Sequence, residues 1–341
     1  MNGTTLFERL GAVKPLRRFA VIFRTLDGIL FGTRTITAGA PHILDHIELK
    51  RYMALVILAL LPSTVAAIAY FGWYALAMII TSYICGGMIE VAFALIRKKS
   101  IEEGFLVTGL IFPLVLPPTT PLWVVAVGVA FGVFFGKEVF GGTGKNIFNP
   151  ALVGRLFVTI AFPEMLSASW RAPFTDAITS ATPLNLYRAG LSMPPIRDLL
   201  FGLTPGSMGE LFRIGVIAGG LFLLLTRVSN WRLPFAYLAT VVAVSALGHI
   251  FAPGKIAPPQ IQLLTGGLLF GAFFMATDPV TSPVTMAGKF IAGVLLGIIT
   301  VLIRSFSGYS EGVMFSIILM NTFAPLIDHM VLAVKYRPAK S

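Results

Sequence analysis

Long apolar runs separated by short polar connections are the feature that most constrains this chain. Apolar residues make up 56% of its 341 positions and charged residues only 12%, whereas a soluble domain carries about 25% charged residues. A run of about 20 apolar residues fits a helix that crosses a bilayer, because a backbone in hydrocarbon must satisfy its own hydrogen bonds. The sequence therefore predicts an all-α integral membrane protein.

Ten apolar segments predict about ten transmembrane helices, and an even number places both termini on one side. Two of the segments are short and interrupted by Pro or Gly, which favours a tilted or re-entrant path for one of them. The ten segments are 52–71, 74–96, 104–119, 121–136, 147–163, 212–226, 233–252, 261–277, 288–303 and 313–334.

The charges agree with this topology. If the termini are cytoplasmic, the inner segments hold 20 of the 26 Lys and Arg residues, which is the positive-inside pattern. The net charge of +11 then reflects topology and does not indicate a nucleic-acid partner. The single cysteine, Cys85, lies in an apolar run, so a disulfide framework within the chain is excluded.

Three regions follow from this pattern: a cytoplasmic tail (1–51), a membrane domain (52–334) and a short cytoplasmic tail (335–341). The first tail carries apolar residues at helical spacing, which predicts a helix on the inner leaflet or against a partner subunit. Within the membrane domain, the long connection 164–211 is expected outside, and long loops often carry function. The apolar residues of the first tail are Leu16, Phe19, Phe23, Leu26 and Leu30.

The chain also contains a weak internal echo. The segment Phe131–Glu138 resembles Phe270–Asp278, and each is an apolar run that ends in an acid. Transporters often place binding sites where repeats meet and helices break, so the echo indicates a possible internal repeat. A coincidental match of two such short segments is the alternative.

Three acids lie within or at the end of apolar runs: Glu138, Asp278 and Asp328. A carboxylate at membrane depth is costly and usually serves an ion path or a partner charge, and its oxygens suit Na⁺, a hard cation. The alternatives are an ion pair with Lys137 for Glu138 and a helix cap before Pro279 for Asp278. Asp328 lies deepest in its run, so a structural role is least expected there.

The segment Phe140–Ala151 is rich in glycine and amide side chains. Gly141 and Gly142 permit close backbone approach to a flat ligand, and Asn146 and Asn149 offer amides that could bind the edge of a flavin ring. The segment fits neither the Walker pattern nor the dinucleotide fingerprint. Generic loop chemistry at a helix break is the alternative.

The outer connection contains Asp176-Ala-Ile-Thr-Ser-Ala-Thr-Pro183. A threonine hydroxyl has no useful acidity, so a threonine here becomes chemically special only if another agent modifies it. On physical grounds alone, this segment is a solvated turn.

Taken together, these blocks resemble a family that contains the B subunit of the Na⁺-translocating NADH:quinone oxidoreductase (Nqr) and the D subunit of the Rnf complex. They run in order over nearly the whole membrane region. The blocks are His46–Arg51, Glu103-Gly104, Pro117–Trp123, Gly136–Gly144, Asn149–Leu152, Gly206–Glu210, Met275–Val280 and Phe323–His329.

The resemblance implies FMN joined by a phosphoester to Thr182, with Asp176, Thr179 and Ala181 as the other motif positions. Ser180 stands where the family usually has Gly. A flavin transferase that acts outside the membrane would attach this FMN. The resemblance also implies a noncovalent riboflavin near Asn146 and Asn149, and acids on a Na⁺ path at Glu138, Asp278 and Asp328.

The implied function is that of a flavin-carrying subunit of an ion-translocating oxidoreductase in the bacterial inner membrane, with the FMN loop periplasmic. Electrons would come from NADH or ferredoxin through partner subunits and leave toward quinone or NAD⁺, with Na⁺ or H⁺ as the pumped ion. The sequences of the blocks are more similar to the Nqr subunit, while the tight turn Phe71–Tyr74 is more similar to the Rnf subunit. A secondary transporter without a redox group and a structural anchor for partner subunits are the rival readings.

Overall fold

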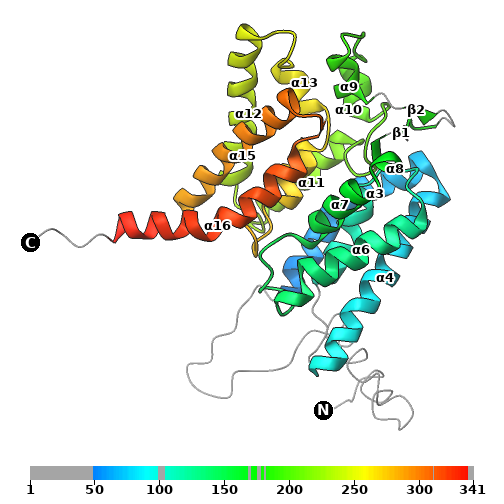
Figure 1. Ribbon diagram of the computed structural model, residues 1–341, viewed down its shortest axis with the longest axis vertical. Coiled ribbons are helices and arrows are strands. Elements are labelled where there is room, and N and C mark those ends of the chain that lie inside the picture. The colour runs from blue at the N-terminus through cyan, green and yellow to red at the C-terminus, as the bar shows by residue number, and fades with distance from the viewer. Residues whose placement is uncertain are drawn as a thin grey trace, which may run out of the picture.

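The computed structural model describes residues 49–98, 104–167, 170–174, 178–179, 182–309 and 311–336. The interfacial helix expected within the first tail and most of the second tail lie outside these residues. The described chain is a helical bundle with one two-stranded antiparallel sheet, in which Trp170 pairs with Thr179 and Arg171 with Ile178 (Figure 1).

The first part of the bundle contains five α-helices and one 3₁₀ turn. They are α3 (Leu49–Phe71), α4 (Trp73–Arg97), α5 (Gly104–Leu114), α6 (Leu122–Gly136), η2 (Glu138–Phe140) and α7 (Pro150–Ala161). The connection that follows holds only short elements. They are α8 (Pro163–Ser167), β1 (Trp170–Arg171), β2 (Ile178–Thr179), α9 (Pro183–Arg188) and α10 (Ile196–Phe201).

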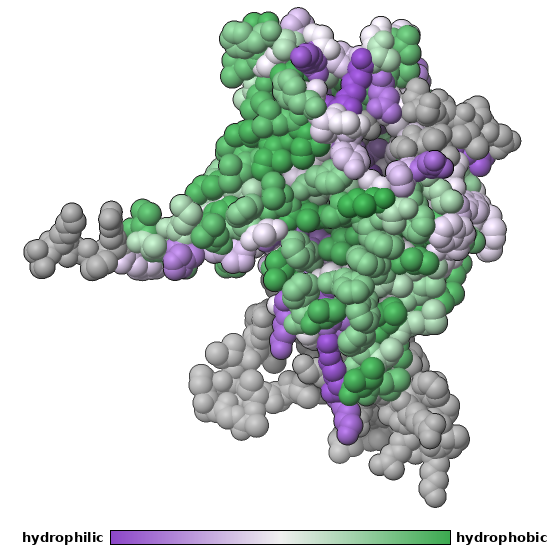
Figure 2. All heavy atoms as spheres, viewed as in Figure 1, coloured by the Kyte–Doolittle hydropathy of each residue, from purple (hydrophilic) through white to green (hydrophobic). Residues whose placement is uncertain are grey.

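The second part also combines long helices with short ones. It contains α11 (Arg213–Leu225), α12 (Arg232–Phe251), α13 (Pro259–Leu264), α14 (Leu268–Phe270), the π-helix η3 (Gly271–Met275), α15 (Met286–Phe306) and α16 (Val313–Lys335). Exposed apolar side chains cover the flanks of the bundle, whereas polar surface gathers toward its upper and lower ends (Figure 2). This distribution is the one a bilayer requires.

Six helical segments of the described chain are long and apolar enough to cross a membrane: α3, α4, α6 with η2, α12, α15 and α16. Four of the ten expected spans are shorter or broken. The 11 residues of α5 extend roughly 16 Å, about half of a hydrocarbon core. The segment expected at 261–277 is interrupted at Gly266, which has a φ of +62°. The structure thus confirms six of the roughly ten expected transmembrane helices, and the others stay a prediction.

The end of α5 shows how a helix can stop inside the bundle. Beyond Leu114 the backbone is not helical, yet its carbonyls remain paired: Gly209 N donates to Leu114 O at 2.7 Å, and Met208 N donates to Leu116 O at 3.2 Å. Pro117 and Pro118 lack the N–H donors that would continue the helix. A distant segment therefore supplies the hydrogen bonds that water would supply elsewhere.

The helix packing follows the same order in both parts. α6 packs between α4 and α7, and α15 packs between α12 and α16, while α3 packs against α11. Glycines permit these close approaches: a Cβ on Gly132 of α6 would collide with the Pro150 carbonyl of α7. By packing, α6 of the first part corresponds to α15 of the second part. The similar sequence segments instead lie at the end of α6 and at η3, so they do not occupy equivalent positions.

Candidate functional site

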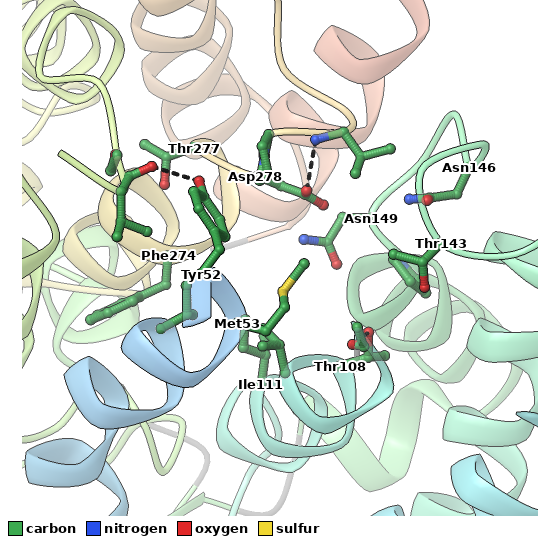
Figure 3. Close-up of a pocket in the computed structure, with 18 of the residues that line it drawn as sticks. Tyr52, Met53, Thr108, Ile111, Thr143, Asn146, Asn149, Phe274, Thr277 and Asp278 are labelled. Carbon is green, nitrogen blue, oxygen red and sulfur yellow. Dashed lines mark hydrogen bonds between the residues drawn. The ribbon is translucent and has the colours of Figure 1, made fainter. Parts of the chain in front are cut away.

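A pocket lies where α3, α5, α11, the segment between α6 and α7, and the chain around η3 meet (Figure 3). We call it the central pocket. Its cavity volume is about 70 Å³. Apolar walls face a group of polar side chains, which is the usual composition of a small-molecule site. The residues used below are Tyr52, Met53, Thr143, Asn146, Asn149 and Asp278.

Asn149 is fixed by its position at the start of α7. Its Oδ1 accepts a hydrogen bond from Ala151 N at 3.0 Å, and Pro150 is the first residue of the helix, a standard N-cap arrangement. Because Oδ1 serves the cap, Nδ2 is the atom left to donate to a ligand. The side chain lies between Asp278 and Met53 (Figure 3).

Asn146 also lines the central pocket and donates from Nδ2 to Phe148 O at 3.0 Å. In the same segment, Thr143 contributes a buried hydroxyl that has no hydrogen-bond partner among the described residues. An unpaired buried hydroxyl is uncommon, and a polar ligand in the pocket would pair with it. The amides and this hydroxyl have the hydrogen-bonding chemistry that the polar edge of a flavin needs, and the other walls are apolar.

Gly141 and Gly142 do not line the central pocket. Their φ angles are +118° and +102°, so only glycine adopts this backbone without strain. They turn the chain after η2 so that Thr143 and Asn146 reach the pocket. Their contribution is thus through backbone geometry.

Asp278 reaches the central pocket from the other part of the bundle. Its Oδ1 accepts a hydrogen bond from Val280 N at 3.1 Å. No helix begins at Pro279, since α15 starts at Met286 with Thr285 as its cap, so the helix-cap alternative for Asp278 is wrong. Burial is the main cause that raises the pKa of the Asp278 carboxyl.

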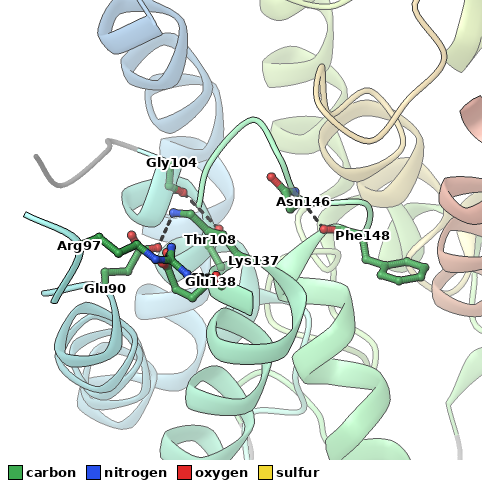
Figure 4. Close-up of polar contacts among 8 residues, drawn as sticks. All are labelled: Glu90, Arg97, Gly104, Thr108, Lys137, Glu138, Asn146 and Phe148. Carbon is green, nitrogen blue, oxygen red and sulfur yellow. Dashed lines mark hydrogen bonds and ion pairs between the residues drawn. The ribbon is translucent and has the colours of Figure 1, made fainter. Parts of the chain in front are cut away.

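Glu138 lies outside the central pocket and forms an ion pair with Arg97 at 2.9 Å (Figure 4). The sequence suggests Lys137 as its partner, and this pairing is wrong. Lys137 instead forms a buried ion pair with Glu90 of α4 and lines the central pocket. Two ion pairs thus tie the end of α6 to α4.

Asp328, in α16, binds the start of α15. Its carboxylate accepts hydrogen bonds from Val284 N at 2.7 Å, from Thr285 N at 3.0 Å and from the Thr285 hydroxyl. It therefore makes structural contacts, although its depth in the apolar run made a structural role the least expected. The described residues contain no cluster of three or more metal-ligating side chains, and the three acids make separate contacts.

Thr182 is the N-cap of α9, and its Oγ1 accepts a hydrogen bond from Asn185 N at 3.4 Å. Thr179 lies in β2, while Asp176 and Ala181 lie outside the described residues. Asn185 lines a second cavity together with Trp170, Arg155 and Tyr309. The expected acceptor therefore lies one helical turn from a cavity with aromatic walls and an arginine.

Several buried charges are not among the residues that the sequence pattern singles out. Arg155 of α7 forms an ion pair with Glu311, and Glu90 pairs with Lys137. By topology Arg155 counts among the inner charges, although it lies within a helix. The cost of a carboxylate in an apolar run, which singles out Glu138, applies equally to Glu90. The presence of an acid within an apolar run could therefore have identified Glu90 from the sequence.

Comparison with known proteins gives consistent matches. The family model described as "NQR2, RnfD, RnfE family" matches residues 36–337. Three relatives are each named as the B subunit of a Na(+)-translocating NADH-quinone reductase. The one from Pseudomonas paraeruginosa is 36% identical over 94% of this chain and 94% of its own length. Those from Azotobacter vinelandii and Klebsiella pneumoniae are 35% and 34% identical, over 98% and 96% of this chain and 96% and 95% of their own lengths.

Proposed function

Because the chain belongs to the NQR2, RnfD and RnfE family, we propose that it is the flavin-carrying membrane subunit of a sodium-translocating NADH:quinone oxidoreductase. The names of its relatives favour this assignment over the Rnf-type ferredoxin:NAD⁺ oxidoreductase. In this proposal the other subunits deliver electrons from NADH, and the complex resides in the bacterial inner membrane with both termini of this chain cytoplasmic.

The observation that carries the proposal is the composition of the central pocket. Asn146, Asn149 and the unpaired Thr143 hydroxyl from one part of the bundle face Asp278 from the other. A flavin in such a site would supply reversible electron transfer at its ring. The protein residues would hold its polar edge, exclude water with the apolar wall and place a carboxylate next to it. We propose that this flavin is a noncovalent riboflavin.

A second flavin, FMN, is proposed to be esterified to Thr182 by a flavin transferase on the periplasmic side. Support comes from the position of the threonine at the start of α9, in the long connection between the two parts of the bundle. The adjacent cavity with Trp170 and Arg155 has room and chemistry for a flavin ring. A tethered cofactor remains in place between electron transfers.

We also propose that Asp278, Asp328 and Glu138 act on the Na⁺ path. Asp278 is the strongest of the three, because it lines a pocket between the two parts of the bundle. A carboxylate beside a flavin responds to the charge that reduction adds, so electron transfer and cation uptake would be coupled as two linked equilibria. Quinone is the proposed final acceptor within the complex.

Flavin content tests both cofactor assignments separately. Thr182→Ala should remove the fluorescent band that a covalent flavin gives on a denaturing gel, and Thr182→Ser should keep an acceptor hydroxyl. Asn149→Asp keeps the cap on α7 but replaces the donor Nδ2 with an acceptor, so it should reduce the flavin released on denaturation and leave the covalent band unchanged. Full covalent flavin in Thr182→Ala would overturn the ester assignment.

The rival reading is a secondary transporter without a redox group. It accounts for the broken helices and the buried acids but leaves the amide-lined pocket without a role. A purified complex with no flavin absorbance would favour the transporter. A purely structural anchor predicts that Asp278→Asn leaves sodium pumping unchanged.

A further inference from the structure

Another pocket, distinct from the cavity near Thr182, lies beside the central pocket, at the ends of α11 and η3 and the starts of α12 and α15. We call it the basic pocket. Its cavity volume is about 500 Å³. It shares Tyr52 and Ser229 with the central pocket, but Arg227 and Lys289 line it alone. The residues used below are Arg227, Ser229, Trp231 and Lys289.

Arg227 and Lys289 bring two positive charges to this pocket. In the part of the chain that the structure describes, neither forms an ion pair with an acid, since the ion pairs of the membrane helices use Arg97, Lys137 and Arg155. Two bases without an acidic partner on one cavity indicate an anionic ligand.

The backbone at Arg227 supports a role for its side chain. The residue follows the C-terminal end of α11 with a φ of +58°. Glycine is the usual residue at such a left-handed position, because a side chain there is strained. Arg227 takes this conformation and lines the pocket.

Ser229 provides an independent polar group. Its hydroxyl is buried and has no hydrogen-bond partner among the described residues, and the residue lines both the basic pocket and the central pocket. An unpaired buried hydroxyl costs free energy unless a ligand completes it. A phosphate oxygen would accept hydrogen bonds from this hydroxyl and from both bases.

The rim of the pocket is apolar, which favours a lipid over a soluble phosphate compound as the ligand. Leu225 is 83% exposed and Val284 is 75% exposed, and both belong to the segments that border the mouth. Trp231 lies at the rim and is half exposed, as tryptophans at a membrane interface are. Two basic side chains beside exposed apolar residues match a phosphate headgroup with acyl chains.

We propose that the basic pocket binds the headgroup of an anionic phospholipid, with Arg227, Lys289 and Ser229 on the phosphate and the acyl chains along Leu225 and Val284. The riboflavin proposed for the central pocket has no phosphate, so this site has a different occupant. Basic pockets between transmembrane helices are suited to such headgroups.

The test is native mass spectrometry of the full chain in detergent, titrated with phosphatidylglycerol or with phosphatidylcholine. The decisive variant is Arg227→Gly, because it removes the charge and relieves the backbone strain together. Lys98→Gly is the matched control: Lys98 is also a basic residue at a left-handed helix end, with a φ of +55°, but it does not line the pocket.

Wild type and Lys98→Gly should bind phosphatidylglycerol more tightly than phosphatidylcholine. Arg227→Gly should bind phosphatidylglycerol about fivefold more weakly, as expected for one lost basic contact, and Lys289→Gln should have a similar effect. Thermal unfolding without lipid should show Arg227→Gly at least as stable as wild type, which establishes that the loss is not misfolding.

Equal phosphatidylglycerol binding by Arg227→Gly and wild type would overturn the proposal. Glycerol 3-phosphate, added as a soluble competitor, should displace the lipid only weakly because it has no acyl chains. Displacement of the lipid at equal concentration would assign the site to a soluble phosphate compound and would also overturn it.

Discussion

Lys137 and Glu90 form an ion pair inside the bundle, and both side chains are almost completely buried (Figure 4). The pair joins the end of α6 to α4 beside the central pocket. The next residue, Glu138, forms an ion pair with Arg97. Lys137 and Glu138 are thus neighbours of opposite charge, and each pairs with a different residue of α4. Removing one member of such a pair deprives the other buried charge of this ion pair.

Lys137→Met should therefore lower the free energy of unfolding by about 3–5 kcal/mol, measured by thermal or chemical unfolding in detergent. Lys145→Met, at an exposed lysine of the same connection, is the control and should change it little. The double variant Lys137→Met/Glu90→Gln should recover much of the loss. Equal stability of Lys137→Met and Lys145→Met would contradict a contribution from the pair.

The contact between Gly132 and Pro150 predicts an effect on flavin binding. Gly132→Ala should push α7 away from α6, because the added Cβ would collide with the Pro150 carbonyl. Since Asn149 caps α7, the shift would move its amide and reduce the noncovalent flavin recovered per chain. The covalent flavin proposed for Thr182 should remain. Gly254→Ala, where a Cβ meets nothing within 4 Å, should bind both flavins normally.

Asp328 should prove important for stability apart from sodium. Asp328→Ala removes three hydrogen bonds at the start of α15 and should cost about 2–3 kcal/mol, since hydrogen bonds to a charged group are strong. Asp328→Asn keeps one acceptor oxygen and should cost less. Unfolding measured in NaCl and in KCl separates the two roles: a loss seen only in NaCl would contradict the capping role.

Glu210 predicts a pH dependence. Burial and, secondarily, the charge of Glu311 raise its pKa from an ordinary 4.5 to about 7, although Arg213 acts in the opposite direction. The folded protein thus binds this proton more tightly than the unfolded chain. The resulting stabilisation is complete below about pH 4.5 and is lost as the pH rises through about 7. The unfolding midpoint of Glu210→Gln should fall less than that of wild type between pH 5 and pH 8, and parallel profiles would refute this.

Much of the fold could be predicted from the sequence, because the six long helices follow directly from apolar runs of sufficient length. The broken segments could not. Residues Val115 and Leu116 are as apolar as the helix before them, yet the helix ends at Leu114, where Gly209 N donates to Leu114 O and Met208 N donates to Leu116 O. Hydropathy measures the tendency to leave water, and it carries no information on a backbone partner far away in the chain.

The candidate site could be predicted in part. The amides of Asn146 and Asn149 do line one pocket, and Asp278 lies there too. Their common location depends on how the two parts of the bundle pack, which no local pattern contains. The sequence pairs Glu138 with its neighbour Lys137, whereas Arg97 approaches from α4. The roles of Thr182 and the three acids stay predictions.

The π-helix Gly271–Met275 gives the chain one spare residue just before Asp278. A π turn contains about one residue more than an α turn, so deleting a single position within it can be absorbed by conversion to regular α geometry. The same deletion in the middle of α15 would rotate every later side chain by about 100° around the helix axis. The approach to the central pocket is thus a place where the length of this protein can vary while its downstream register is preserved.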